Sequence, residues 1–360
     1  MEALNSRLTN AVQRMRQQGV DALVVGSVAN FYYFTGKWIE PHERLLALVI
    51  RGEGEPLVVS PEMHRQDFEH STWECLFWWD GEDAMGVLSR HLQETGTVAI
   101  DSLWSSGHLL SLMKCRPRVA FVDGEPLLSG MRQVKDETEL AIIREAGGIA
   151  DRVMGALMKS IAPGMREREL VELLGSLWKK EGVYEQSFAP IVAAGANGAR
   201  PHHVPDDTVV KDGDMIILDI GGRLKHYCSD MTRTVCVGSA SDEMRTVYEL
   251  VRAAQQAGLD AVKPGVPFSE VDRAVRDVIT AGGYGDYFTH RTGHGLGIDV
   301  HELPSVHGAS EAIVEQRMVF SVEPGIYLPG RFGVRIEDIV IVTESGCEPV
   351  NKVAKDLLIV

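Results

Sequence analysis

The chain has 360 residues, of which 44% are hydrophobic and 24% are charged, a composition typical of a folded protein of about two domains. Its 51 acidic residues outnumber its 36 lysines and arginines, and the net charge of -15 argues against binding to nucleic acids or to anionic membrane surfaces. No apolar run reaches the length of about 18 residues that crosses a bilayer, and the five cysteines form no C-x-x-C pair. We therefore expect a soluble, cytoplasmic protein with reduced cysteines.

The first 130 residues alternate short apolar runs with amphipathic stretches. Runs typical of strands lie at 22–25, 45–50, 57–60, 98–100 and 119–122. The helical spacing of Leu8, Val12 and Met15 precedes the first of them, and a further amphipathic stretch lies at 83–92. Short strands separated by helices predict a mixed α/β domain over residues 1–130.

Residues 131–360 show a different pattern. Apolar residues at helical spacing run from Leu140 to Leu157, and the helix is expected to stop at Pro163-Gly164. Further helices are predicted at about 166–181, 242–263 and 268–281, and strands at about 214–221, 224–237, 317–323 and 334–343. Helices grouped apart from clustered strands indicate an α+β domain.

Four carboxylates interrupt the apolar strands of this second domain: Asp219, Asp230, Glu323 and Glu337. Burying one ionised carboxylate costs several kcal/mol, so four of them in strand centres require a shared positive charge. A pair of divalent cations is the natural compensation. The sequence therefore predicts a metal site built from these four side chains.

Histidines accompany the acidic residues. A glycine-rich segment carries His290, His294 and His301, and its glycines would let the backbone approach a metal or a substrate closely. His202 and His203 lie in a loop just before the first acidic strand. An imidazole beside oxygen ligands favours Mn²⁺, Co²⁺ or Zn²⁺ over Mg²⁺ and Ca²⁺.

These motifs resemble those of the pita-bread metallopeptidases, the family of methionine aminopeptidase, aminopeptidase P and prolidase. The matching motifs are LDIG at Asp219, SDMTRT at Asp230, TGHGLG at His294, VEPG at Glu323 and RIED at Glu337. The similarity covers about 137–360, while the N-terminal half resembles the creatinase-type domain of the family's proline-specific branch. The resemblance implies an α/β creatinase-like domain at 1–130, an α+β pita-bread catalytic domain at 131–360, and cleavage of the bond before proline.

The resemblance also implies a metal centre and its chemistry. Two divalent ions, with Mn²⁺ preferred and Co²⁺ or Zn²⁺ as alternatives, would be held by Asp219, Asp230, His294, Glu323 and Glu337. Asp230 and Glu337 would bridge both ions, and a water bridging them would become a hydroxide nucleophile. Glu323 would accept the proton of that water and help deliver it to the departing proline nitrogen.

Residues outside the ligand set receive roles from the same resemblance. His202, His290 and His301 would bind the substrate or the developing oxyanion, with His203 as the adjacent alternative to His202. Arg335 would orient the carboxylate of Glu337.

The resemblance leaves the substrate open. Archaeal-type prolidases carry an arginine where this chain has Ser305, so another cation, Arg291 or Arg331, could hold the carboxylate of a dipeptide. We expect an Xaa-Pro dipeptidase. An aminopeptidase P acting on longer peptides is the alternative, and a metal-dependent amidase is a further one. A metal-free relative, creatinase-like or a binding protein, would usually have lost several of the five ligands, and all five stand here.

The resemblance further implies the partners. Besides a proline-containing peptide, we expect a second copy of the chain, because proline-specific relatives usually form homodimers. The segment 38–42 is the candidate contact. No nucleic acid or membrane partner is expected.

Overall fold

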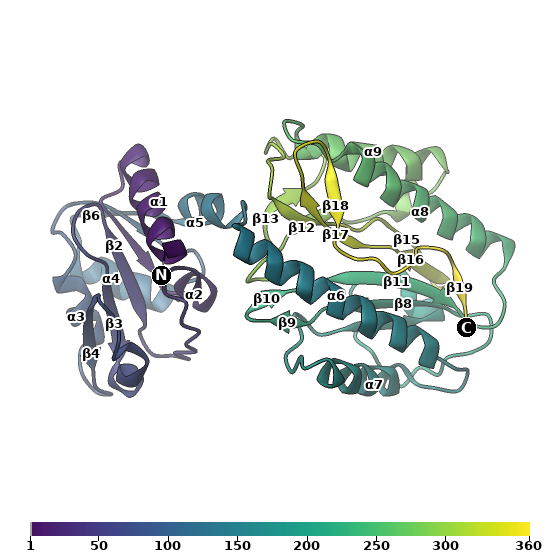
Figure 1. The fold of residues 1–360 in the computed structure, drawn as a ribbon, viewed down its shortest axis with the longest axis horizontal. Helices are drawn as coiled ribbons and strands as arrows, with labels where there is room; N and C mark the ends of the chain where they lie inside the picture. Colours follow the sequence, from purple (N-terminus) through teal and green to yellow (C-terminus); the bar gives the residue numbers. More distant parts are fainter. Residues whose placement is uncertain (1) are drawn as a thin grey trace. The chain divides into compact units, whose positions relative to one another are not determined.

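The computed structural model describes residues 2–360, with side chains from Leu4 onward. Contacts within the chain divide it into two compact units, which are separated in the sequence between Arg132 and Gln133. In Figure 1 each unit consists of β-sheet covered by helices. Within residues 2–360, every helix is too short or too polar to cross a membrane.

The N-terminal unit is built on one six-stranded sheet. Its strands are β1 (Ala22–Val25), β2 (Ala47–Arg51), β3 (Leu57–Pro61), β4 (Glu74–Trp78), β5 (Gly96–Ile100) and β6 (Val119–Asp123). They lie in the order β4-β3-β2-β1-β5-β6, and β1 runs antiparallel to β2 but parallel to β5. The helices are α1 (Glu2–Gln18), α2 (Val28–Thr35), η1 (Glu62–Phe68), α3 (Ala84–Arg90), α4 (Ser106–Cys115) and α5 (Glu125–Arg132). The predicted mixed α/β architecture is confirmed.

The C-terminal unit contains two larger sheets and two hairpins. Its strands are β7 (Ile191–Ala194), β8 (Met215–Ile220), β9 (Arg223–Leu224), β10 (Tyr227–Cys228), β11 (Met231–Cys236), β12 (Gly293–Gly295), β13 (Glu302–Val306), β14 (Val319–Val322), β15 (Gly325–Leu328), β16 (Phe332–Arg335), β17 (Asp338–Val342), β18 (Cys347–Pro349) and β19 (Leu358–Ile359). The sheet orders are β19-β11-β8-β7 and β13-β12-β14-β17-β18. The hairpins are β9–β10 and β15–β16.

Helices cover these sheets through two apolar cores. They are α6 (Glu137–Ser160), α7 (Glu167–Lys180), α8 (Asp242–Ala261) and α9 (Phe268–Ala281), with short turns η2 (Gly195–Ala199) and η3 (Gly285–Tyr287). One core packs α6 and α7 against β8 and β11, and the other packs α8 and α9 against β14, β15 and β17. Figure 1 shows α8 and α9 side by side, well apart from α7. The predicted α+β architecture is confirmed.

Two predicted strands are interrupted. The segment 224–237 forms β9, β10 and β11, because the chain reverses at Lys225 and His226, which both have positive φ. The segment 334–343 is divided between β16, which pairs with β15, and β17, which pairs with β14. Both interruptions occur beside acidic residues assigned to the metal site. A run of apolar residues in the sequence indicates that a segment is buried, but it does not indicate where the chain stops pairing with one strand and begins to pair with another.

The core beneath α9 depends on an aromatic pair. Phe268 is fully buried and packs edge-to-face on Phe320, with 5.0 Å between ring centroids. The substitution Phe268→Ala should therefore lower the free energy of unfolding by about 3–5 kcal/mol in urea titrations, because it leaves a cavity. Tyr287→Ala, at a side chain that is 38% exposed, should cost less than about 1 kcal/mol. Equal losses in the two variants would contradict this account of the core.

Candidate metal centre

A cavity of about 470 Å³ opens in the C-terminal unit, and every residue that the sequence analysis assigned to the site lines it. The nine residues are Asp219, Asp230, His294, Glu323, Glu337, His202, His290, His301 and Arg335. His203 and Arg291 also line the cavity, and Phe188, Pro190 and Ile191 belong to its apolar wall. The fold thus brings together residues that are separated by more than a hundred positions in the sequence.

Three of the four acidic residues lie at strand ends. Asp219 is inside β8 and faces Thr232 across the antiparallel pair with β11. Asp230 directly precedes β11, Glu323 directly follows β14, and Glu337 lies in the two-residue step between β16 and β17. The prediction that all four occupy strand centres is wrong for these three. Their carboxylates meet because the chain leaves or changes a sheet at each of these points.

His294, in the glycine-rich segment, lies in a strand. Its strand β12 lies between β13 and β14. A Cβ atom on Gly293 would collide with the carbonyl oxygen of Ser321, and one on Gly295 with that of Leu303. The lack of a side chain at these two glycines therefore lets the neighbouring strands pack closely against β12. The expectation that the glycines of this segment let a metal or a substrate approach the backbone stays a prediction.

Each carboxylate of the site except Asp230 receives a direct side-chain hydrogen bond. Arg335 Nη2 donates to Asp219 Oδ2 at 2.7 Å. The hydroxyl groups of Thr232 and Ser321 donate to Glu337 Oε2 at 2.6 Å and to Glu323 Oε1 at 3.0 Å. These donors orient the carboxylates, and two positive charges, those of Arg335 and Arg291, line the cavity with four acids.

The electrostatics of the site follow from this shortage of positive charge. Burial and then the charges of the neighbouring carboxylates raise the pKa values of Asp230 and Glu337 well above their ordinary range. Burial also raises the pKa of Glu323 to about 7. Burial, followed by the charge of His301, lowers the pKa of His294 to about 3, so its imidazole is neutral at pH 7. Neutral imidazole is the form that binds a metal.

The donor set fits divalent cations. Asp219 Oδ1 and Asp230 Oδ1 are buried and have no hydrogen-bond partner among the described residues. One ligand atom each from Asp230, His294 and Glu337 lie within 4.8 Å of one another, and His294 Nε2 is 3.3 Å from Glu323 Oε1. Buried oxygens without donors are costly unless a cation binds them. This arrangement suits hard or intermediate divalent ions with one imidazole ligand.

Glu167, His203 and Asp206 form a second group with metal-ligating side chains. Here the carboxylate of Glu167 is satisfied by protein: Oε2 bonds His203 Nε2 at 2.6 Å and accepts from the backbone of Asp206 at 2.9 Å. Its other oxygen accepts from Ala194 N and Asn197 Nδ2. The group therefore anchors the loop that carries His202. Sequence analysis missed Glu167, which lies in an ordinary amphipathic helix.

The histidines around the candidate metal ligands differ in whether their side chains are bonded to other residues. His202 and His301 are exposed to solvent, and neither side chain bonds another described residue. His203, the alternative to His202, is buried against Glu167. His290 Nδ1 bonds the Arg291 carbonyl at 2.7 Å, and Nε2 bonds Tyr327 Oη at 2.8 Å.

Tyr327 connects His290 to the ligand set. Arg335 Nη1 donates to Tyr327 Oη at 3.0 Å, which leaves the tyrosine proton for His290 Nε2. Burial and then the charge of Arg335 lower the pKa of His290 to about 4, so its ring is neutral. Both ring nitrogens of His290 are thus engaged by protein. The sequence held no signal for Tyr327 beyond its place four residues after Glu323.

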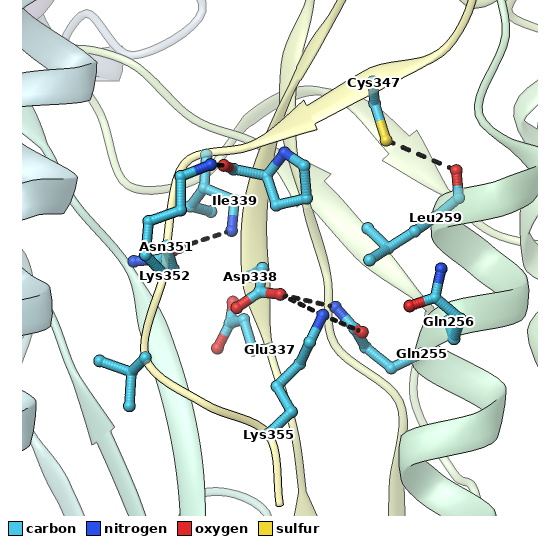
Figure 2. Close-up of polar contacts among 12 residues, drawn as sticks. Gln255, Gln256, Leu259, Glu337, Asp338, Ile339, Cys347, Asn351, Lys352 and Lys355 are labelled. Carbon is cyan, nitrogen blue, oxygen red and sulfur yellow. Dashed lines mark hydrogen bonds and ion pairs between the residues drawn. The ribbon is translucent and has the colours of Figure 1, made fainter.

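A buried charge cluster lies behind Glu337. Asp338 accepts hydrogen bonds from Arg233 Nη2 at 2.7 Å, Lys355 Nζ at 2.8 Å and Gln255 Nε2 at 3.1 Å. Figure 2 shows Lys355 and Gln255 converging on this carboxylate. Arg233 Nη1 also donates to the carbonyl oxygen of Glu337 at 2.6 Å. The cluster fixes the backbone of a candidate ligand from the side away from the cavity.

Comparison with known proteins identifies the family. Residues 141–344 match the model of metallopeptidase family M24, and residues 7–134 match that of the creatinase/prolidase N-terminal domain. The chain therefore belongs to metallopeptidase family M24, a family of metal-dependent peptidases, and it combines a creatinase-type domain with the pita-bread catalytic domain.

Solved structures resemble the whole chain. A prolidase from Thermococcus sibiricus has a TM-score of 0.94 and 35% identity, covering 98% of both chains. The dipeptidase PepE from Mycobacterium ulcerans has a TM-score of 0.95 and 35% identity, covering 100% of this chain and 98% of its own. An X-Pro aminopeptidase from Thermotoga maritima has a TM-score of 0.87 and 31% identity, covering 98% and 99%.

Substitution of Asp338 tests the cluster behind Glu337. Asp338→Asn would leave Arg233, which is 1% exposed, without its counter-charge, and such a loss costs about 3–5 kcal/mol. We expect a lower Tm and a lower metal content after dialysis. Asp356→Asn breaks an ion pair whose carboxylate is 83% exposed, and it should change stability by less than about 1 kcal/mol. A stable Asp338→Asn protein with full metal content would refute the role of the cluster.

Metal removal should make stability depend on pH. Above about pH 7.5 an unfolded histidine is almost wholly neutral. Burial keeps His290 and His294 neutral in the folded chain at this pH, because it lowers their pKa values to about 4 and about 3. The acids of the site are not equivalent in the two states: burial raises the pKa of Glu323 from 4.5 to about 7 in the folded chain, and it raises those of Asp230 and Glu337 well above their ordinary range. The metal-free folded state therefore binds more protons than the unfolded state, and its stability must fall as pH rises.

Differential scanning calorimetry of chelator-treated protein between about pH 7.5 and 9, above the range in which unfolded histidines titrate, measures this effect. The Tm should decrease with pH, and saturating Mn²⁺ should flatten the curve because bound cations replace the protons. Asp230→Asn without metal should show a shallower decrease than the unsubstituted protein. A Tm of the metal-free protein that is constant or rises with pH would contradict these pKa directions.

Proposed function

We propose that this metallopeptidase hydrolyses the Xaa-Pro bond of dipeptides with the help of two divalent metal ions. The observation that carries the proposal is the convergence of four carboxylates, three of them buried and that of Glu323 16% exposed, with one neutral imidazole in a single cavity. The similar structures named prolidase and dipeptidase, each 35% identical over nearly the whole chain, support the choice of a dipeptide substrate.

Asp219, Asp230, His294, Glu323 and Glu337 would hold the ions. Mn²⁺ is the proposed metal, with Co²⁺ or Zn²⁺ as alternatives, because oxygen ligands with one imidazole suit these ions. When bound, the ions would lower the pKa of a water toward neutrality and polarise the carbonyl group of the scissile bond.

Glu323 is the proposed proton carrier. Its side chain is 16% exposed, compared with 6% for Asp230, and the hydroxyl of Ser321 fixes one of its oxygens. A carboxylate that faces the cavity can accept the proton of the attacking water and then transfer it to the departing nitrogen. The nitrogen of proline carries no hydrogen in the peptide, so it requires this proton in order to leave as an amine.

His202 and His301 are the proposed donors to the substrate. Their side chains are exposed at the cavity and form no hydrogen bond with other described residues, so their N–H groups are available to a carbonyl oxygen or to the oxyanion. His290 would act differently. With both nitrogens engaged, it supports Tyr327 and Arg335, which in turn hold Asp219.

An aminopeptidase P that removes the first residue from longer Xaa-Pro peptides is the second candidate. The similarity to the X-Pro aminopeptidase from Thermotoga maritima, at 31% identity, favours it. The substrates of the two candidates differ on the C-terminal side of proline, which bears a free carboxylate in a dipeptide and a further peptide bond in a longer peptide.

A side-by-side hydrolysis assay tests the proposal. Protein loaded with Mn²⁺ is given an Xaa-Pro dipeptide or the matching Xaa-Pro-Yaa tripeptide, and a chelated sample serves as the control. We expect chelator-sensitive cleavage of the dipeptide, with a kcat/KM at least about 100-fold above that of the tripeptide. Glu323→Gln should lower kcat at least about 100-fold, the scale of general acid–base catalysis, while metal content stays the same.

Each other result has a definite meaning. Efficient cleavage of the tripeptide would replace the dipeptidase assignment by aminopeptidase P. If neither peptide were cleaved, the proline specificity would be wrong. If Glu323→Gln kept more than a few per cent of the activity with its metal bound, another group would have to carry the proton.

A further inference from the structure

The loop that leads into the strand of His294 depends on side chains for its conformation. Residues 288–292 lie between η3 and β12 and belong to neither a helix nor a strand. This loop carries His290, and the carbonyl oxygen of Thr292 accepts a hydrogen bond from the backbone N–H of Glu323 at 2.9 Å. The conformation of loop 288–292 therefore affects both a histidine of the cavity and the proposed proton carrier.

Arg276 of α9 holds this loop by its backbone. Nη1 donates to the carbonyl oxygen of Phe288 at 3.1 Å, and Nη2 donates to that of His290. Nε donates to Asp272 Oδ2 at 2.7 Å. All three nitrogens of one guanidinium group are thus engaged, on two carbonyl groups of the loop and on one carboxylate of the same helix. The fixed fork of donors in arginine makes this arrangement possible.

Asp272 ties down the other end of the loop. It lies one turn before Arg276 on α9, and its side chain is buried. Its Oδ1 accepts a hydrogen bond from Thr292 Oγ1 at 2.7 Å, while Oδ2 accepts from Arg276. Both ends of loop 288–292 are therefore bonded to a single turn of α9. Neither Asp272 nor Arg276 is among the residues that line the cavity.

Ring contacts continue from Arg276 toward the candidate metal ligands. Its guanidinium carbon lies 4.4 Å from the centroid of the Phe288 ring, which packs edge-to-face on the ring of His290 at 5.1 Å. The His290 ring lies 5.5 Å from that of Tyr327, whose hydroxyl group accepts a hydrogen bond from Arg335. A displacement of Phe288 would therefore disturb groups that hold a candidate ligand.

We propose that the Asp272–Arg276 pair positions Glu323 and His290 for hydrolysis by fixing loop 288–292. The inference rests on the proposed function for the role that it gives to Glu323. A proton carrier must lie within hydrogen-bond reach of the proton that it transfers, and a displacement of about 1 Å costs about 100-fold in rate. The pair acts through these two residues and does not itself contact the substrate.

The kinetic experiment uses Mn²⁺-loaded protein and the proline peptide that the unsubstituted protein cleaves best. Arg276→Gln should lower kcat at least about 10-fold. Arg276→Lys should recover part of the loss, because an ammonium group still serves some of the acceptors. Thr292→Val, which keeps the shape of the side chain and removes its bond to Asp272, should also lower kcat. Arg273→Gln is the matched control: this arginine of the same helix is 66% exposed, pairs with Glu270, and should be replaceable without effect.

A double substitution separates positioning from a general structural loss. If Arg276 acts through Glu323, Arg276→Gln should lower kcat by a clearly smaller factor in the Glu323→Gln protein than in the unsubstituted protein. An equal factor in the two backgrounds would contradict action through Glu323.

Hydrogen exchange tests the positioning without catalysis. In Arg276→Gln, the amide of Glu323 and those of loop 288–292 should exchange at least about 10-fold faster, because a hydrogen bond to a charged group is worth that factor in the equilibrium of local opening. Amides of α6 should be unchanged. The visible absorption spectrum of Co²⁺-loaded protein should also change, since it reports how the ligands are arranged.

These results distinguish the inference from the proposed function. If the unsubstituted protein cleaves no proline peptide, but Arg276→Gln still speeds exchange at Glu323 and changes the Co²⁺ spectrum, the proposed function fails and the positioning stands. If Arg276→Gln keeps full kcat, or loses kcat with unchanged exchange in the loop, the inference is wrong. Circular dichroism and metal content verify that each variant is folded and loaded. Should Arg276→Gln not fold, Arg276→Lys and Thr292→Val decide by the same measurements.

Discussion

Mutual repulsion among three buried carboxylates and the partly exposed one of Glu323 is the constraint on which the C-terminal unit depends. Raised pKa values at Asp230 and Glu337 express it directly. The fold meets it with single donors: Arg335 for Asp219, and hydroxyl groups for the two glutamates. These donors hold some oxygens and leave others, such as Asp219 Oδ1, without a partner. The protein thus presents a site that is already shaped for a cation, at the expense of stability in the absence of one.

The same constraint bears on why three of the acids, Asp230, Glu323 and Glu337, lie just outside strands. In an uninterrupted strand, a carboxylate would be positioned by one sheet only. The two-residue step between β16 and β17 instead brings the carboxylate of Glu337 against the hydroxyl group of Thr232, which belongs to a different sheet. Successive residues of the chain then face opposite sides. Glu337 faces the cavity, and Asp338 faces a compensated cluster with Arg233 and Lys355. The backbone of these two residues therefore separates two charged clusters. The carboxylate of Asp338 is neutralised by protein side chains, whereas that of Glu337 is open to ligands in the cavity.

The sequence was sufficient for the parts of the structure that have local signals. Helical periodicity located α6, α7, α8 and α9, and acids inside apolar runs, read with the family motifs, singled out side chains that line one cavity. Residues whose role depends on contacts with distant parts of the chain gave no local signal in the sequence. Glu167 looks like a surface residue of an amphipathic helix, and Tyr327 looks like an ordinary strand aromatic. The glycines beside His294 suggested the close approach of a metal or a substrate, and only the packing of β13 and β14 shows that neighbouring strands approach two of them.

The loop before β8, which carries His202 and His203, is anchored by Glu167. This affects the design of chimeras between related enzymes. Glu167, at the start of α7, binds groups from η2 and from the loop after it, including the neighbour of His202. Helix α7 and the loop that carries His202 therefore depend on each other for their conformation. A loop transplanted from a relative without its helix would lose the carboxylate that holds His203, and His202 would reach the cavity on a backbone of undefined conformation. Chimeras should exchange 167–206 as a single block.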